Sequence, residues 1–438
     1  MPASAPVPGS NPAAAPVPSH IEGPASASAG RPAAIPDLPP APGWVAPVIV
    51  VTAAQAVLAM MTRALPLFGL PLTLAAGMAP EAAGQMAAAT SLGSMLFFLW
   101  GPALAAGIPS LHQMRLGIGL GAAALCLCLL PNWPLILLAA FLIGLGYGPS
   151  APAGSDILMR LVPPARRHFV FSFKQAGVPL GGLAAGLLLP AIGLAWGTGA
   201  ALLATAAIGG LAALALGHGN VGLDDHPGGA PPPRPRGAEM LLAPLRMAAM
   251  LLRSRDLRVL SLAGIGLAVA QGVLLAFYPV LLSDGAGWSL TAAGGAFALL
   301  QGVGIGGRIL MGWLTDRAGS GRLMLAGMCL ASGLTMLAIA ATGPGTPAVL
   351  VMLLAGLAGI TVISWNGIFL TELAIASPEG QVGAVTAAGT FILFSGYVVS
   401  PLLAQLTVTL SGGYGAAYAF GGIAPALGAL ALLAARRR

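Results

Sequence analysis

Long apolar runs, separated by short polar breaks, follow one another from Gly43 to the end of the chain. Each run is close to or above the ~20 residues that an α-helix needs to cross a bilayer. The pattern predicts an all-α membrane protein with twelve transmembrane helices, over 45–74, 82–106, 115–132, 134–159, 169–194, 197–217, 257–283, 288–313, 322–341, 346–373, 382–409 and 412–435.

Several predicted spans contain proline inside the apolar run, among them the spans with Pro149, Pro179 and Pro279. A proline cannot donate a helical hydrogen bond, but in a membrane protein neighbouring helices can satisfy the carbonyl that it frees. We therefore expect these prolines to kink their helices rather than to end them.

The polar interruptions divide the chain into four parts. Residues 1–43 are rich in Pro, Ala and Ser and lack the pattern of a secretory signal, so we predict a disordered cytoplasmic tail. Residues 218–256 contain several arginines and Pro-Gly runs and are predicted to form a basic cytoplasmic linker. This linker separates an N-terminal six-helix bundle, 44–217, from a C-terminal six-helix bundle, 257–438.

Composition and charge agree with a membrane protein. Only 7% of the residues are charged and the mean hydropathy is +0.90, whereas a soluble protein has roughly 25% charged residues. The arginines fall in alternate loops, so the positive-inside rule predicts that both termini lie in the cytoplasm. The predicted location is the plasma (inner) membrane. The net charge of +7 therefore indicates topology and not a nucleic-acid partner.

The two halves of the chain repeat weakly. The Ala-Gln-Ala-Val-Leu of 54–58 returns as Ala-Gln-Gly-Val-Leu at 270–274, which pairs Gln55 with Gln271. Gly101 corresponds to Gly312 at a similar offset. The repeat predicts two bundles of similar construction.

A polar segment, 312–322, lies between two of the apolar spans. It resembles the signature loop of the major facilitator superfamily of transporters, with matches at Gly312, Leu314, Asp316, Arg317 and Gly319. It departs at Ser320 and Gly321, where the family has basic residues, and Arg322 comes one place later. The resemblance covers about 44–435 and implies two pseudo-symmetric bundles around a central site that opens alternately to each side.

The resemblance also implies a latch at the cytoplasmic end. Asp316 is expected to cap the start of the fifth span, at 169–172, when that end is closed. Arg308 and Arg317 are expected to steady the loop. Glu372, at the end of the tenth span, is expected to pair with Arg308 or Arg317.

Arg63 lies inside the first span with no acid nearby in the sequence. A buried charge needs a partner, so Arg63 is expected either to bind a substrate anion or to extend to the outer headgroups. Lys174, the only lysine, is expected at the cytoplasmic mouth of the cavity, with the cavity itself as the alternative. Weaker candidates for lining the cavity are Gln55, Gln175, Gln271, Tyr278, Gln301, Trp365 and Asn366; helix-to-helix bonding for Gln55 and Gln271, and packing for Trp365, are the alternatives.

These features indicate a secondary transporter of a small organic anion or a neutral polar metabolite. No Asp or Glu lies in the middle of a span, so a co-transported proton remains open. Small residues at 177, 181, 182 and 186 predict close helix contact, and 177–182 resembles an element of proton-coupled exporters, so export of amphipathic compounds is one alternative. A transporter-like solute sensor is the other.

No nucleophile, acid–base pair or metal-ligand spacing is present in the sequence, and the three cysteines lie inside apolar runs. We therefore expect no enzyme activity, no cofactor and no metal. The expected partners are the lipid bilayer and a small-molecule substrate, with no nucleic acid and with a monomeric chain.

Overall fold

The computed structural model describes residues 43–105, 107–163, 166–217, 238–378 and 381–435. In these ranges every regular element is a helix, which confirms the predicted all-α class. Ten of the helices are long and apolar enough to cross a membrane. The predicted tail, apart from Gly43, and the first part of the predicted linker, 218–237, lie outside the described residues.

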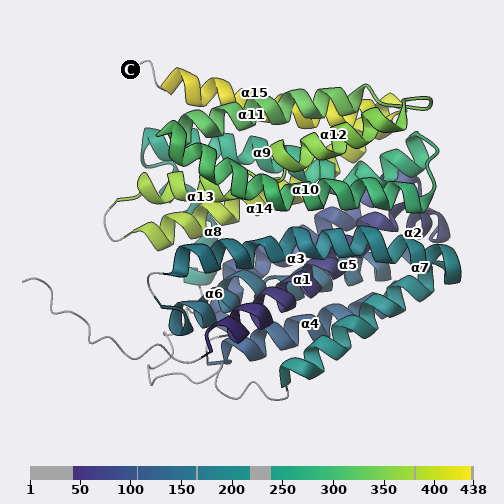
Figure 1. Cartoon of the computed structure of the whole chain (residues 1–438), viewed down its shortest axis with the longest axis horizontal. Helices are drawn as coiled ribbons and strands as arrows, with labels where there is room; N and C mark the ends of the chain where they lie inside the picture. Colours follow the sequence, from purple (N-terminus) through teal and green to yellow (C-terminus); the bar gives the residue numbers. More distant parts are fainter. Residues whose placement is uncertain (1–42, 106, 164–165, 218–237, 379–380, 436–438) are drawn as a thin grey trace, which may run out of the picture. The chain divides into compact units, whose positions relative to one another are not determined.

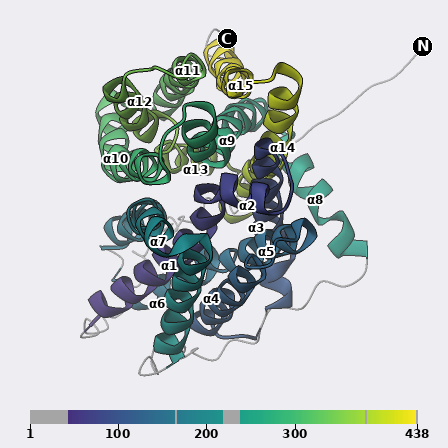
Figure 2. The same ribbon diagram turned by 90° about the vertical axis from the view of Figure 1, so that its right-hand side faces the viewer.

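The helices of the two halves form two groups, which are seen end-on in Figure 2 and from the side in Figure 1. The first group contains α1 Val45–Leu67, α2 Gly69–Ala75, the short 3₁₀ helix η1 Pro80–Ala82, α3 Ala83–Leu104, α4 Ser110–Leu127, α5 Trp133–Tyr147, α6 Ser150–Leu161 and α7 Arg167–Gly217. The second group contains α9 Arg255–Val280, the π-helical η3 Leu281–Gly285, α10 Leu290–Ala318, α11 Gly321–Ala340, α12 Ala348–Thr361, α13 Asn366–Ile375, α14 Val382–Ser411 and α15 Tyr414–Ala435.

The long helix α7 covers two of the predicted spans. Its backbone is non-helical at Gly197, where φ is 87°, a value that side-chain-bearing residues rarely adopt. This glycine lies at the predicted boundary between 169–194 and 197–217. Counting the two arms of α7 separately, and including α4, the described helices are consistent with the predicted twelve spans.

Glycines of α7 allow it to pack closely on both groups of helices. A Cβ atom at Gly177 would lie 2.9 Å from the carbonyl oxygen of Thr52 on α1. A Cβ atom at Gly186 would lie 2.7 Å from the carbonyl oxygen of Gly294 on α10. Any larger side chain would separate these backbones, so the predicted close contact through small residues is confirmed.

Two predicted spans are interrupted next to the centre of the molecule. Gly148 and Pro149 separate α5 from α6, but both keep right-handed helical backbone angles and Trp133–Leu161 forms one helix of membrane-spanning length. The prediction that Pro149 kinks its helix and does not end it is therefore confirmed. Pro179 and Pro279 also lie inside continuous helices, as predicted. A second interruption, at 362–365, separates α12 from α13 in the other half. Such interruptions are tolerated in membrane proteins where the backbone lines a cavity or is buried in protein.

The turn inside the predicted signature loop is shorter than expected. Helix α10 continues through Gly312 and Asp316 and ends at Ala318. Gly319 then adopts a left-handed conformation with φ of 63°, and the Ser320 hydroxyl accepts a hydrogen bond from the backbone N–H of Leu323, at 3.3 Å. The turn is therefore confined to Gly319 and Ser320, because the preceding residues are good enough helix formers to extend α10.

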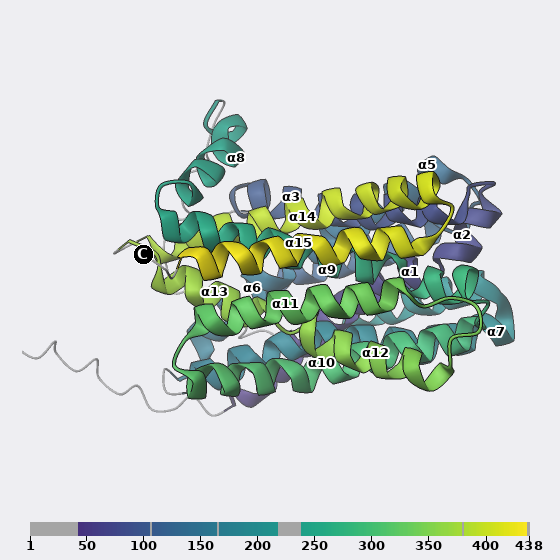
Figure 3. The ribbon, with the colours of Figure 1, turned by 90° about the horizontal axis from the view of Figure 1, so that it is seen from above.

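The predicted linker contains a helix that the sequence analysis did not anticipate. Helix α8, Ala238–Leu251, lies beside α14 and projects outward in Figure 3. Leu251 is buried in the hydrophobic core of the second half, and Met247 and Met250 pack against that core. The arginines of the segment favoured a polar linker in the sequence analysis. The apolar residues that hold α8 against the core are spaced at helical intervals, and that spacing was not considered.

Candidate functional site

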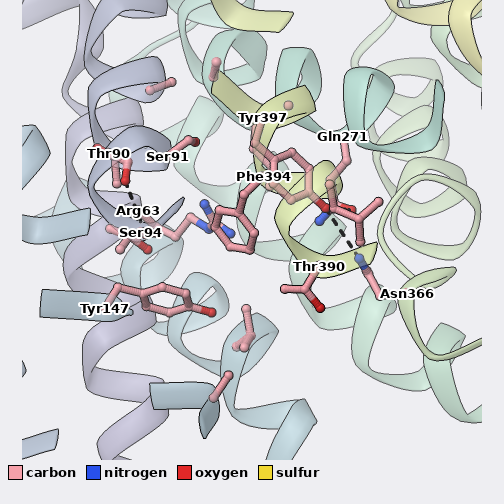
Figure 4. A pocket seen from close by; sticks show the side chains of 18 of the residues that line it. Arg63, Thr90, Ser91, Ser94, Tyr147, Gln271, Asn366, Thr390, Phe394 and Tyr397 are labelled. Atoms are coloured by element: carbon pink, nitrogen blue, oxygen red, sulfur yellow. Dashed lines mark hydrogen bonds between the residues drawn. The ribbon is translucent and has the colours of Figure 1, made fainter. Parts of the chain in front are cut away.

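A cavity of about 260 Å³ lies between the two halves. Helices α1, α3, α5, α6 and α7 supply one wall, and α9, α10, α13 and α14 supply the other. Figure 4 shows Arg63 and Tyr147 on the first wall pointing toward Phe394, Tyr397 and Asn366 on the second. The polar lining residues are Gln55, Thr62, Arg63, Thr90, Ser91, Ser94, Tyr147, Gln175, Gln271, Arg308, Asn366, Thr390 and Tyr397.

Arg63 lies inside this cavity. Its position on α1 places the side chain among the lining residues, and its Nε atom is buried without a hydrogen-bond partner among the described residues. Figure 4 shows the guanidinium reaching toward Phe394 across the cavity. Of the two positions that the sequence left open, the structure therefore has the side chain in the cavity and not at the outer headgroups.

Arg308 also lies in the cavity, which corrects its expected place beside the signature loop. It occupies α10 more than two helical turns before Asp316, so its side chain faces the centre and not the loop. Its Nη1 atom donates a hydrogen bond to the backbone carbonyl oxygen of Gln175, at 3.2 Å. Its Nε atom, like that of Arg63, is buried with no partner in the described part of the chain.

The lining carries two positive charges and no compensating acid. Among its described residues, Arg63 and Arg308 are charged, and none is Asp, Glu, His or Lys. No ion pair of either arginine is found in the described ranges. Two cations that are partly removed from water without a carboxylate are unfavourable, so the cavity favours an anion.

The two repeat-related glutamines both line the cavity, and each bonds to a different helix. Gln55 on α1 donates from Nε2 to Oε1 of Gln175 on α7, at 3.3 Å. Gln271 on α9 accepts at Oε1 from the hydroxyl of Tyr397 on α14, at 3.1 Å, and from Nε1 of Trp365, at 3.0 Å. Each glutamine is therefore a cavity-lining residue and a helix-to-helix link at the same time.

The sequence analysis missed several hydroxyl-bearing lining residues. Thr90, Ser91 and Ser94 form a stripe on one face of α3, and Ser94 donates to the carbonyl oxygen of Gly144 on α5, at 2.9 Å. Tyr147 and Tyr397 line opposite walls. A polar stripe at i and i+4 within an apolar run was the available signal, whereas single tyrosines in apolar spans offered none.

Three of the residues predicted to line the cavity lie outside its lining. Tyr278 is buried and its hydroxyl donates to the carbonyl oxygen of Val351, at 3.4 Å. Gln301 is buried beside Gly182, and Trp365 packs on Phe369 with ring centroids 5.7 Å apart. Trp365 nevertheless contacts the cavity indirectly, through Gln271.

Lys174 is in neither of its expected places. It is only 1% exposed, between α6 and α7, and it is absent from the lining. Its Nζ atom donates to the carbonyl oxygen of Ala151, at 2.8 Å, and to the hydroxyl of Ser155, at 2.9 Å. The expected position at the cytoplasmic mouth is corrected, because the flexible side chain reaches polar acceptors on the adjacent helix.

The expected partner of Glu372 is also corrected. Its Oε2 atom lies 3.7 Å from Nε of Arg322, and Nη1 of Arg322 lies 2.9 Å from Oδ1 of Asp256. A Cβ atom at Gly321 would collide with the Glu372 carboxylate. The glycine that departs from the family pattern thus makes room for an acid, and Arg322 links α9, α11 and α13.

The remaining loop residues lie at the surface. Arg317 is placed over the ring of Trp313, 4.1 Å from its centroid, and Asp316 is exposed at the end of α10. The side chains of Phe169 and Ser172, in the segment that Asp316 was expected to cap, lie outside the described residues. The latch therefore stays a prediction.

Comparisons with known proteins agree with this architecture. A family model described as Major Facilitator Superfamily matches residues 52–401. An uncharacterised MFS-type transporter of Mycobacterium tuberculosis is 27% identical over 287 residues, covering 65% of this chain and 61% of that protein's length.

Solved structures share the fold at low sequence identity. A peptide transporter POT in complex with sulfate has a TM-score of 0.71 and 16% identity, covering 89% of this chain and 94% of that chain. A bacterial homologue of the human lysosomal transporter Spinster, inward-facing and unoccupied, has a TM-score of 0.64 and 18% identity, covering 90% and 95%. Since the family model spans well over half of the chain, this protein belongs to the major facilitator superfamily and is a multi-pass membrane transporter.

Proposed function

We propose that this transporter moves a small organic anion across the plasma membrane by alternating access, with both termini in the cytoplasm. The observation that carries the proposal is the pair of cavity arginines, Arg63 and Arg308, in a lining whose described residues include no acid. A cation entering this cavity would meet two like charges at low dielectric, whereas an anion would supply the missing partner.

The lining favours an organic anion over an inorganic one. Its polar groups alternate with hydrocarbon and aromatic side chains, including Leu275, Leu393, Phe98 and Phe394. Burial of a substrate's hydrocarbon part against these groups adds to its affinity in proportion to the apolar area buried. The volume of about 260 Å³ suits a metabolite of modest size better than a drug-sized compound.

The arginines also suggest how binding and conformational change are linked. They come from different halves, Arg63 from α1 and Arg308 from α10. A carboxylate that binds both guanidinium groups joins the two walls, so its affinity depends on their separation. A ligand whose affinity differs between two conformations shifts their populations, which is the physical requirement for alternating access.

Ligand-induced thermal stabilisation of the purified protein tests the proposal. Succinate, phenylacetate and propionate would be compared with glucose and tetraethylammonium on the wild type and on Arg63→Gln and Arg308→Gln. A ligand that binds only the folded protein raises Tm with its concentration relative to Kd. Stabilisation by acids that is lost in both variants is expected.

Arg258→Gln is the matched control, because Arg258 is exposed on α9 and outside the cavity lining. Its response to the acids should equal that of the wild type. Uptake of the stabilising acid, radiolabelled, into proteoliposomes then checks transport. Stabilisation by the cation alone, or acid binding that ignores both cavity substitutions, would contradict the proposal.

A further inference from the structure

A chain of hydrogen bonds with a fixed direction runs from Trp365 to the cavity. The indole N–H of Trp365 can only donate, and it donates to the side-chain oxygen of Gln271 at 3.0 Å. This contact determines which end of the Gln271 amide is the oxygen. The Tyr397 hydroxyl, 3.1 Å from the same oxygen, must therefore donate its proton there.

The direction of this chain determines the orientation of Asn366. Because the Tyr397 hydroxyl has given its proton to Gln271, it can only accept from Asn366, whose Nδ2 atom lies 3.4 Å away. The amide nitrogen of Asn366 therefore faces Tyr397. Its other end, Oδ1, is buried without a hydrogen-bond partner among the described residues, on a side chain that lines the cavity. Figure 4 shows Gln271, Tyr397 and Asn366 side by side on this wall.

The cavity thus presents two kinds of unmet polar group. Arg63 and Arg308 are donors that require an acceptor, while Oδ1 of Asn366 and Oε1 of Gln55 are acceptors that require a donor. The Gln55 amide faces another amide, Gln175, and can turn either end to it, so only Asn366 is an acceptor of fixed orientation. A buried polar atom left without a partner is costly, so the complementary ligand satisfies both kinds. It carries an anionic group together with an N–H or O–H donor.

The charge of the lining restricts the type of donor. An ammonium group would bring a third positive charge beside two arginines, with no acid among the described lining residues to offset it. A hydroxyl group donates without adding charge, and it does not bring the carbonyl oxygen that accompanies a neutral amide N–H and needs a donor of its own. We propose that the substrate is a hydroxy-substituted organic acid, with its carboxylate at the arginines and its hydroxyl donating to Asn366; this rests on the proposed transport of an organic anion.

Matched trios of acids test this assignment by their Kd values in thermal-shift titrations of the full-length protein. Each trio has a hydroxy acid, its methyl ether and its deoxy analogue: lactate, 2-methoxypropionate and propionate; 3-phenyllactate, 2-methoxy-3-phenylpropionate and 3-phenylpropionate. The ether keeps the oxygen but has no proton to donate. One hydrogen bond of ordinary strength predicts a Kd about three- to tenfold lower for the hydroxy acid than for either analogue.

Two substitutions should abolish the difference in Kd between each hydroxy acid and its two analogues. Asn366→Ala deletes the acceptor, and Trp365→Phe deletes the donor that sets the direction of the chain. Trp133→Phe is the matched control, because Trp133 also donates its indole N–H to a glutamine, Gln85, at 2.9 Å, but both residues lie outside the cavity lining. It should keep the preference for the hydroxy acid.

The outcomes separate the two proposals. One outcome is that acids bind through Arg63 and Arg308, but the hydroxy acid and its ether have equal Kd values. This would overturn the proposed substrate class and would leave the proposal of anion transport standing. A preference that survives Asn366→Ala would also overturn it. If no acid of either trio stabilises the protein, or if binding ignores both arginines, the proposed function and this inference are both wrong.

Discussion

Arg308 on α10 donates a hydrogen bond to the backbone carbonyl oxygen of Gln175 on α7, at 3.2 Å. In a continuous helix this carbonyl would accept from the N–H of the residue four places later, but that residue is Pro179, which has none. The proline therefore leaves an acceptor open on one half of the transporter, and an arginine of the other half occupies it. The contact holds a cavity cation across the boundary between the halves.

Replacement of Pro179 by alanine should weaken anion binding without destabilising the protein. Alanine supplies a backbone N–H that donates to the Gln175 carbonyl oxygen, so this oxygen is no longer free to accept from Arg308. The Arg308 side chain is then held in place only when the anion binds. Ordering of a long side chain on binding costs about 0.5–1.5 kcal/mol, which predicts a Kd roughly two- to tenfold higher. Isothermal titration calorimetry, with an acid that stabilises the protein in the thermal-shift panel, measures this change.

The control for this prediction is Pro425→Ala on α15, another proline inside a helix, which does not line the cavity. Both variants should have Tm values equal to or above that of the wild type, because each regains a helix former. An unchanged Kd in Pro179→Ala would show that the Arg308 contact does not position the guanidinium.

Removal of either cavity charge should not destabilise the protein in the absence of ligand. Arg63 and Arg308 have no carboxylate partner among the described residues, so each is a desolvated charge that opposes folding. Arg63→Gln and Arg308→Gln are expected to have Tm values equal to or above the wild-type value in thermal unfolding in detergent. A fall of several degrees in Tm would instead indicate a structural role.

Gly186 should control the balance between conformations. A valine at this position would meet the backbone of Gly294 and Ala298 on α10, so the close approach of α7 and α10 would be lost. The described arrangement of the halves should therefore become less populated in Gly186→Val. Distances between spin labels on α7 and α10, measured by double electron–electron resonance, should shift to larger values.

A matched substitution on the second arm of α7 is Gly210→Val, because a Cβ atom at Gly210 meets nothing within 4 Å. It should leave the distance distribution unchanged. If Gly186→Val gives the wild-type distribution as well, the contact between α7 and α10 adapts and does not set the balance.

The ion pairs of Arg322 should contribute unequally to stability. Glu372 is 10% exposed in its side chain and would be left nearly buried without a partner in Arg322→Gln, whereas Asp256 is 53% exposed. We expect Arg322→Gln to lower the free energy of unfolding by about 1–3 kcal/mol and Asp256→Asn by less than about 1 kcal/mol. Thermal or denaturant unfolding of both variants tests the order, and a reversed order would contradict the assignment.

Asp316 should affect transport but not the stability of the described conformation. Its side chain is exposed at the end of α10, so Asp316→Asn removes no buried contact there. If the implied latch forms when the cytoplasmic end closes, the substitution should slow uptake into proteoliposomes by several-fold while Tm and expression stay at wild-type values. Wild-type uptake rates would exclude the latch.

The sequence by itself determined the class of the protein. Apolar runs of membrane-spanning length are local properties, since each helix satisfies its own backbone hydrogen bonds in lipid, and this fixed the all-α class. The loop with Asp316 and Gly319 indicated the family. The unpaired charge of Arg63 left two positions open, the cavity or the outer headgroups, and the repeat of Gln55 and Gln271 favoured a cavity-lining role for both glutamines.

Only the tertiary structure decided which polar residues share the cavity. Arg308 lies close to the signature loop in sequence, and the rotation of α10 about its axis turns it to the centre instead. Lys174, one residue before a lining glutamine, points the other way into α6. Neighbouring residues in a helix point in different directions. Whether a side chain reaches the cavity therefore depends on how whole helices pack, which no short stretch of sequence specifies.

The clearest example of a feature decided by the tertiary structure is the direction of the hydrogen-bond chain formed by Trp365, Gln271, Tyr397 and Asn366. These residues come from three helices and the interruption between α12 and α13. Their types allow many pairings, and an amide can turn either end to its neighbour. Contact with a group that can only donate removes that freedom, and such a contact exists only after the helices have packed.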